Sequence, residues 1–111
     1  MRMLTIEKLR AWGADVDEGL GRCMNNEGFY LRLAEKALQD PNFGKLKEAV
    51  DAQDREGAFD AAHALKGVTL NLALRPVSEP VVEATERLRG GDIEVLELVK
   101  EIEEKRKEIL G

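Results

Sequence analysis

One short stretch of the chain, AAHALKGVTLNLAL at 61–74, brings three residues of chemical interest together. His63, the single histidine, is followed by Lys66 three positions later and by Gly67 four positions later. On a helix these separations place all three on one face, within about one turn. Histidine is a nucleophile near neutral pH, and lysine supplies a positive charge. Glycine leaves bare backbone beside the imidazole, at a cost of about 1 kcal/mol relative to alanine. The face is therefore typical of a histidine exposed for attack on a phosphoryl donor.

The spacing of apolar residues predicts which side of this helix faces water. Asp60, His63, Gly67 and Leu70 share a stripe that we expect to be exposed, and an exposed leucine beside bare backbone suits a docking surface. Asp60 and Leu70 are therefore candidate partner contacts. The alternative interpretation is an ordinary surface or core histidine without chemistry. The neighbouring stripe, with Leu65 and Leu72 beside it and Lys66 at its edge, is expected to be buried: Phe59, Ala62, Lys66, Thr69 and Ala73.

The motif His-x-Leu-Lys-Gly at 63–67 resembles the signature of histidine-containing phosphotransfer (HPt) domains. The following stretch, GVTLNLALRPVSEPVVEATERLRGGD, resembles the rest of the family's phosphorylated helix, a short turn and the next bundle helix. The opening GADVDEGLGRCMNNEGFYLRLAEKAL resembles the family's N-terminal region. The resemblance thus extends over nearly the whole chain.

This resemblance implies a covalent phosphoryl carrier of a two-component phosphorelay, not an enzyme with its own ATP site. His63 would be the phosphoacceptor, Lys66 would neutralise phosphoryl charge, and Gly67 would give steric access. The implied partners are a response-regulator receiver domain and a histidine kinase or hybrid kinase, and the implied state is a monomer. The chain has no P-loop and no nucleotide-binding glycine pattern. We therefore expect no cofactor of its own, with Mg²⁺ held by the receiver partner.

Thr85 departs from the family pattern. It lies 22 positions after His63, where the family often has a Gln or Glu that hydrogen-bonds the imidazole. Threonine is shorter and can orient the imidazole directly or through water; equally, it can be an edge residue without that contact. Arg89, one turn further on, is a candidate contact to the phosphoryl group or the partner, with a solvated surface arginine as its alternative.

Other functional classes fit the sequence less well. The dimerisation domain of a histidine kinase usually has an acidic residue and soon a proline after its histidine, whereas Ala64 and Leu65 follow here. A metal-binding bundle is disfavoured by the single histidine and the lack of an E-x-x-H motif. A helical adaptor that docks receiver domains without carrying a phosphoryl group remains the main alternative.

Composition narrows the partners further. The formal net charge of −5, from 17 basic and 22 acidic residues, argues against nucleic acid. No apolar run approaches the roughly 20 residues of a membrane span, and the opening MRMLTIEKLRAWG lacks a signal-peptide core. Cys23 has no second cysteine with which to form an internal disulfide. We expect a cytoplasmic protein with no membrane partner.

The periodicity predicts an all-α single domain over 1–111. Helix starts are expected at Thr5, at Asp15 or Asp17, and at Asn26, with Gly13 ending the first helix. Short connections favour an antiparallel up-down four-helix bundle with additional N-terminal helices covering one end or side. The expected bundle helices are 42–53, 54–74, 78–90 and 92–110.

Two prolines affect the third bundle helix. We expect Ser78 to cap it, which would place Pro80 in the first turn, where a missing N–H is harmless. A start at Pro76 with a kink at Pro80 is the alternative. Asp92 is expected to cap the last helix, whose core contacts are expected to be Ile93, Leu96, Val99, Ile102 and Ile109.

Overall fold

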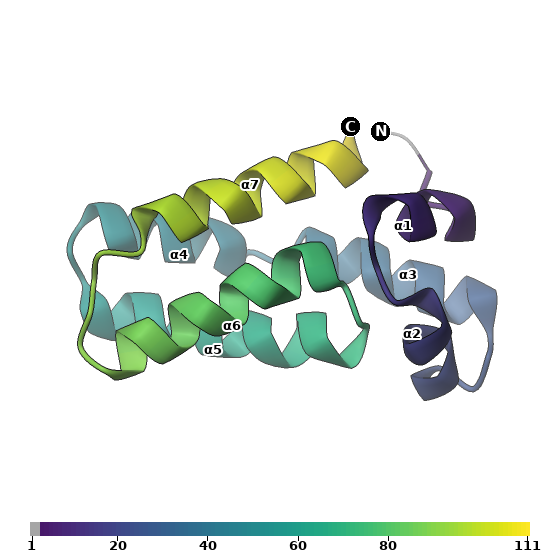
Figure 1. The fold of residues 1–111 in the computed structure, drawn as a ribbon, viewed down its shortest axis with the longest axis horizontal. Helices are drawn as coiled ribbons and strands as arrows, with labels where there is room; N and C mark the ends of the chain where they lie inside the picture. Colours follow the sequence, from purple (N-terminus) through teal and green to yellow (C-terminus); the bar gives the residue numbers. More distant parts are fainter. Residues whose placement is uncertain (1–2) are drawn as a thin grey trace.

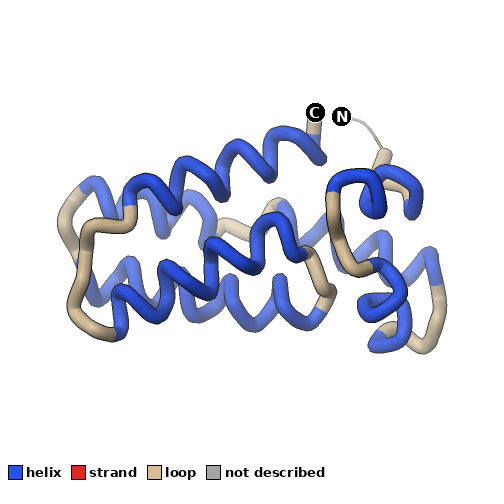
Figure 2. The backbone as a smooth tube through the Cα atoms, viewed as in Figure 1, coloured by secondary structure: helices blue, strands red, loops and turns tan. Residues whose placement is uncertain are grey.

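The computed structural model describes residues 3–111, and every regular element in this range is an α-helix. The helices are joined by short turns and loops (Figures 1 and 2). An all-helical fold is therefore confirmed. The helices are α1 (Ile6–Trp12), α2 (Val16–Arg22), α3 (Glu27–Leu38), α4 (Asn42–Asp51), α5 (Arg55–Asn71), α6 (Arg75–Arg89) and α7 (Leu96–Leu110).

The first three helices begin where the sequence predicts. The side chains of Thr5, Asp15 and Asn26 each accept a hydrogen bond from a backbone N–H three residues further on, which satisfies a donor that the helix itself leaves unpaired. Asp15, not Asp17, is the cap of α2. Gly13 ends α1 with a φ of 118°, a conformation that favours glycine.

The four C-terminal helices pack against one another around one apolar cluster. Helix α4 contacts α5, α5 contacts α6, α6 contacts α7, and α7 returns to contact α4. Their buried side chains include Phe43, Leu65, Leu88 and Ile102. We name this the bundle cluster. It holds α5 and α6 side by side along the length that carries the candidate site.

A second apolar cluster packs the N-terminal helices against the residues that follow α5, the first turn of α6 and the last turn of α7. Tyr30 and Leu38 of α3 are fully buried in it together with Leu74, which follows α5. Figure 1 shows α1 and α2 gathered at one end of the molecule. We name this second group the N-terminal cluster.

Helix α6 begins earlier than the sequence predicts. Arg75 is its first residue, so the expected start at Ser78 is wrong, and Ser78 is buried inside the helix. Pro76 occupies the first turn, where its missing N–H costs nothing, while Pro80 lies in the interior and gives up one backbone hydrogen bond. Pro80 is itself buried, and packing of the apolar residues of this helix outweighs that loss.

Helix α7 begins later than the sequence predicts. Its first residue is Leu96, and Val95 occupies the cap position, so the expectation that Asp92 caps it is wrong. The carboxylate of Asp92 instead accepts the N–H of Glu94 within the preceding turn. Leu96 is 43% exposed and is not a core residue, whereas Val95 is buried. Val99, Ile102 and Ile109 are buried as expected, and Ile93 packs against the bundle cluster.

Candidate functional site

His63 lies near the middle of α5 on a face that points to solvent. Asp54 caps this helix by accepting the N–H of Gly57, which fixes where it starts. The expected stripe of Asp60, His63, Gly67 and Leu70 is exposed. The opposite side is buried: Ala58, Ala61, Ala62, Leu65 and Thr69. The sequence therefore predicts the orientation of this helix, although α5 ends at Asn71, before the expected Leu74.

An aromatic ring lies against the imidazole. The ring of Phe59 stacks on His63 with centroids 5.5 Å apart and planes inclined by 30°. The guanidinium carbon of Arg89, from α6, lies 5.1 Å from the centroid of the same Phe59 ring. Phe59 is half-buried, so it contributes both to the core edge and to the site. Arg89 thus faces α5 and is tied to the surroundings of His63 through Phe59.

Two cations of the site share a carboxylate. Lys66 Nζ lies 3.8 Å from Glu86 Oε2, and Arg89 Nε lies 3.4 Å from the same oxygen. Lys66 is half-buried at the edge of the core stripe, as expected, and its amine reaches across to α6. The face around His63 therefore carries two positive charges and one negative charge from these three residues.

Gly67 leaves open space on the same face. A Cβ built at this position would meet no atom within 4 Å outside its own local backbone. Gly67 and Leu70, whose side chain is 43% exposed, line a shallow concavity that continues onto α2 through Glu18 and Arg22. The surface beside the imidazole is thus accessible to a large partner and is partly built by the N-terminal helices.

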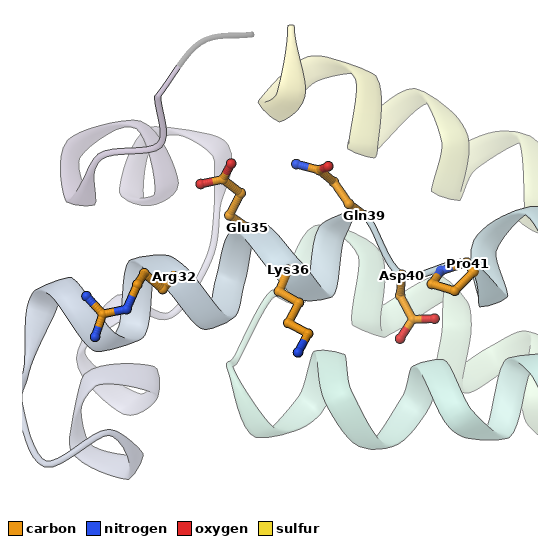
Figure 3. A pocket seen from close by; sticks show the side chains of 6 residues that line it. All are labelled: Arg32, Glu35, Lys36, Gln39, Asp40 and Pro41. Carbon is orange, nitrogen blue, oxygen red and sulfur yellow. The ribbon is translucent and has the colours of Figure 1, made fainter.

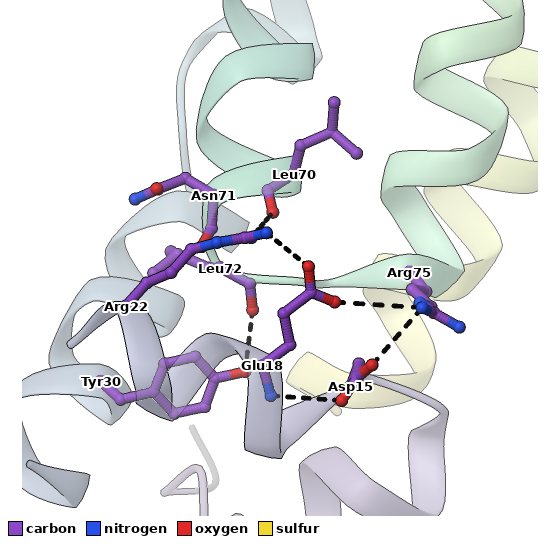
Figure 4. A network of polar contacts seen from close by, with 8 residues as sticks. All are labelled: Asp15, Glu18, Arg22, Tyr30, Leu70, Asn71, Leu72 and Arg75. Atoms are coloured by element: carbon purple, nitrogen blue, oxygen red, sulfur yellow. Dashed lines mark hydrogen bonds and ion pairs between the residues drawn. The ribbon is translucent and has the colours of Figure 1, made fainter. Parts of the chain in front are cut away.

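A polar network attaches those helices to the end of α5 (Figure 4). Arg22 Nη1 donates to the carbonyls of Leu70 and Asn71 at 2.7 and 3.1 Å, and its other nitrogen Nη2 pairs with Glu18. No basic residue stands in the last turn of α5. Arg22 therefore supplies from α2 the positive charge that the C-terminal end of a helix favours.

Tyr30 adds a buried contact to the same end of α5. Its hydroxyl donates to the carbonyl of Leu72 at 2.9 Å. Burial raises the pKa of Tyr30 to about 12. Gly19 of α2 packs so closely here that a Cβ would overlap the Tyr30 ring and the Leu72 carbonyl. This glycine is required by close approach, not by a turn.

Thr85 is fully buried on α6. Its hydroxyl donates to the carbonyl of Val81, one turn earlier, at 2.7 Å. Its single proton is therefore used inside α6, and no hydrogen bond joins it to His63 among residues 3–111. Orientation of the imidazole by Thr85 stays a prediction.

Other features of the described residues lie away from His63. A concavity at the end of α3, drawn in Figure 3, is lined by side chains of mixed charge, including Arg32, Glu35 and Asp40.

Residues 3–111 contain no group of three or more His, Cys, Asp and Glu side chains placed to hold a metal ion. None of the described helices is long and apolar enough to cross a membrane.

The family model for the Hpt domain matches residues 31–108, from within α3 through most of α7. The chain therefore belongs to the Hpt domain family. These domains are phosphocarrier modules of two-component phosphorelays and are generally not enzymes. The match leaves out α1, α2 and the start of α3, so it covers only part of the opening stretch that resembles the family. Comparisons with curated proteins and with solved structures gave no match.

Sequence reasoning missed two residues of the site. Phe59 is predicted only as part of the buried stripe, yet its position one turn before His63 was a signal for ring contact. Glu86 is not predicted at all. Its spacing of three residues from Arg89 indicates a pair on one helix face, but its approach to Lys66 depends on how α5 and α6 are aligned, which the sequence alone does not reveal.

Proposed function

We propose that this chain is a histidine phosphotransfer protein that carries a phosphoryl group on His63. The observation that supports this most directly is an exposed, single histidine, inside the matched Hpt region, with Lys66 one turn away and open backbone at Gly67. Neutral imidazole has a nitrogen lone pair for attack. Lys66 and Arg89 supply positive charge on the face where the phosphoryl group would arrive.

The proposed reaction is a phosphoryl exchange between an acyl phosphate and an imidazole. A ring nitrogen of His63 forms the N–P bond while the O–P bond of an aspartyl phosphate breaks, and the aspartate carboxylate leaves with the electron pair. The reverse step passes the group to a receiver. Phosphoryl transfer needs in-line positioning and charge neutralisation more than covalent help. Lys66 provides part of that charge here, and Mg²⁺ in the receiver partner provides more.

The proposed partners are a response-regulator receiver domain and a histidine kinase or hybrid kinase. Hpt domains interact with these two classes generally. Asp60 and Leu70 flank the approach to His63, and Arg89 stands beside it, so these three are proposed partner contacts. We further propose that α4 to α7 form the up-down antiparallel bundle of one domain, and that the chain acts as a monomer in the cytoplasm.

The proposal is tested by labelling with phosphoramidate, a small donor whose P–N bond breaks as ammonia leaves. The wild-type chain should acquire an acid-labile, base-stable label, and His63→Gln should acquire none. Full labelling of His63→Gln would overturn the assignment. ATP and Mg²⁺ alone should give no label, and robust self-labelling free of contaminating kinase would overturn the carrier interpretation.

The alternative is an adaptor that docks receiver domains without being phosphorylated. The hydrogen bond from the Thr85 hydroxyl to the Val81 carbonyl favours this alternative, because it uses the single hydroxyl proton of the residue at the family's usual imidazole-orienting position. Receiver binding that is equal for the wild-type chain and His63→Gln, with no label on either, would support it.

A further inference from the structure

A single carboxylate oxygen connects the two helices beside His63. Glu86 Oε2 faces Lys66 of α5 at 3.8 Å and Arg89 of α6 at 3.4 Å. The three side chains are between 31% and 54% exposed, so water and salt reach them. Arg89 is also placed on the Phe59 ring that stacks on the imidazole. Glu86 is therefore the residue that both cations of the site contact before any phosphoryl group is present.

Resting on the proposed function, we propose that Glu86 is a positioning residue that holds Lys66 and Arg89 before transfer and competes with the phosphoryl group for them afterwards. Among these three side chains in the unphosphorylated chain, one negative charge is opposed by two positive charges. A phosphoryl group on His63 brings a charge of about −1.5 to −2 at neutral pH. The carboxylate of Glu86 then repels the phosphoryl group and continues to attract Lys66 and Arg89. These two cations therefore bind the phosphoryl group less strongly. Phospho-His63 is thereby kept less stable, and more readily passed on, than the same site without Glu86.

This role differs from a contribution to folding. Ion pairs between exposed side chains contribute little to the free energy of unfolding, because solvent screens them and ordering two long side chains costs entropy. The competition changes the stability of phospho-His63 relative to the unphosphorylated chain, and it makes or breaks no covalent bond. Its signature is therefore a changed phosphorylation equilibrium at unchanged thermal stability.

The chain offers a matched control at Glu83. This residue lies one turn earlier on α6, is 52% exposed, and pairs with Arg87 at 2.6 Å. Glu83→Gln therefore removes the same charge from the same helix, while leaving Lys66 and Arg89 with their partner. Any effect of net charge alone appears equally in both variants.

The experiment measures the exchange equilibrium between the chain and phosphoramidate at a fixed ammonium concentration, by ³¹P NMR of phospho-His63. We expect Glu86→Gln to raise the equilibrium constant for phosphorylation by about two- to fivefold at low salt, and Glu83→Gln to leave it nearly unchanged. About 0.5 M NaCl should remove most of the difference. The melting temperatures of both variants should stay close to that of the wild type.

The outcomes separate this inference from the proposed function. Equal equilibrium constants for Glu86→Gln and Glu83→Gln, or a decrease for Glu86→Gln, would overturn the competition while leaving phosphorylation of His63 intact. A wild-type chain that acquires no label at His63 would overturn both.

Discussion

The ring of Phe59 stacks on the imidazole of His63, with centroids 5.5 Å apart. The two residues are four positions apart on α5, so the helix itself sets their contact. On α6, Arg89 lies over the same phenyl ring. Phe59 thus restricts the motion of the imidazole from one side and links it to a cation of the neighbouring helix, without a hydrogen bond.

Replacing Phe59 with leucine tests this contact. Phe59→Leu keeps apolar bulk at the core edge but removes the ring. The stacked pair, worth about 0.5–1.5 kcal/mol, holds the imidazole in one orientation, so freeing the imidazole predicts a rate of labelling by phosphoramidate that is lower by up to about tenfold. In ¹H NMR the imidazole signals should move as the ring current disappears, and the single histidine makes them unambiguous. Phe29→Leu, at an exposed site on α3, is the control. Unchanged imidazole signals in Phe59→Leu would contradict the stacking.

Gly67 is predicted to be present for access. A Cβ at this position would meet no atom within 4 Å outside the local backbone, and the φ angle of Gly67 is not positive. Gly67→Ala should therefore fold and gain up to about 1 kcal/mol in the free energy of unfolding. Gly67→Gln should also fold but place a long side chain beside His63. Transfer from a phosphorylated receiver domain should fall in the order glycine, alanine, glutamine, and labelling by phosphoramidate should change less.

Gly44 provides the comparison for Gly67. It is also helical and exposed, and a Cβ there would also meet nothing within 4 Å, but it lies on α4. Gly44→Gln should leave transfer unchanged. Equal receiver transfer rates for the wild type, Gly67→Ala and Gly67→Gln would show that Gly67 does not serve access.

Because Tyr30 is buried, we expect the chain to lose stability at alkaline pH. Its pKa is about 12 in the folded chain and near 10 when unfolded, mainly because burial disfavours the phenolate. The unfolded state therefore loses its proton first. The neutral Tyr30 phenol therefore contributes about 2–3 kcal/mol to the free energy of unfolding below about pH 10. This contribution is lost as the pH rises towards 12.

The measurement is urea unfolding between pH 8 and 11.5, with phenolate absorbance of the only tyrosine as a direct titration. Tyr30→Phe is the matched variant. It should cost about 1 kcal/mol at pH 8, through loss of the bond to the Leu72 carbonyl. Its free energy of unfolding should also fall less between pH 10 and 11.5 than that of the wild type. Identical declines in both would rule out Tyr30 as the cause.

Local signals predicted much of the fold. The caps at Thr5 and Asn26 depend on hydrogen bonds within three residues, so the sequence contains all the information they need. The start of α6 was missed because the local penalty of Pro80 is outweighed by burial, which depends on the whole bundle. Asp92 was misassigned because the same side chain caps a turn as readily as a helix.

In the candidate site, too, features set by local spacing were predicted, whereas contacts between separate helices were not. The exposure of His63 and Gly67 follows from spacing along one helix and was predicted. The shared oxygen of Glu86 joins α5 to α6, and the concavity beside Leu70 needs Arg22 from α2. Such contacts depend on the packing of separate helices, which no periodicity within one segment encodes.

The bundle cluster contains the buried apolar residues of α5, whereas the N-terminal cluster includes Leu72, just after that helix. His63 lies over the bundle cluster, whereas Leu70 lies where Arg22 holds the N-terminal helices to the end of α5. Opening of α1 and α2 in native-state hydrogen exchange would alter the surface at Leu70 while leaving the packing beneath His63 closed. In evolutionary terms, substitutions among residues 3–26 are expected to alter the surface at Leu70 more than the packing beneath His63. On the proposed function, an engineer would exchange residues 3–26 to alter the surface at Leu70 while keeping His63, Lys66 and Gly67 in place.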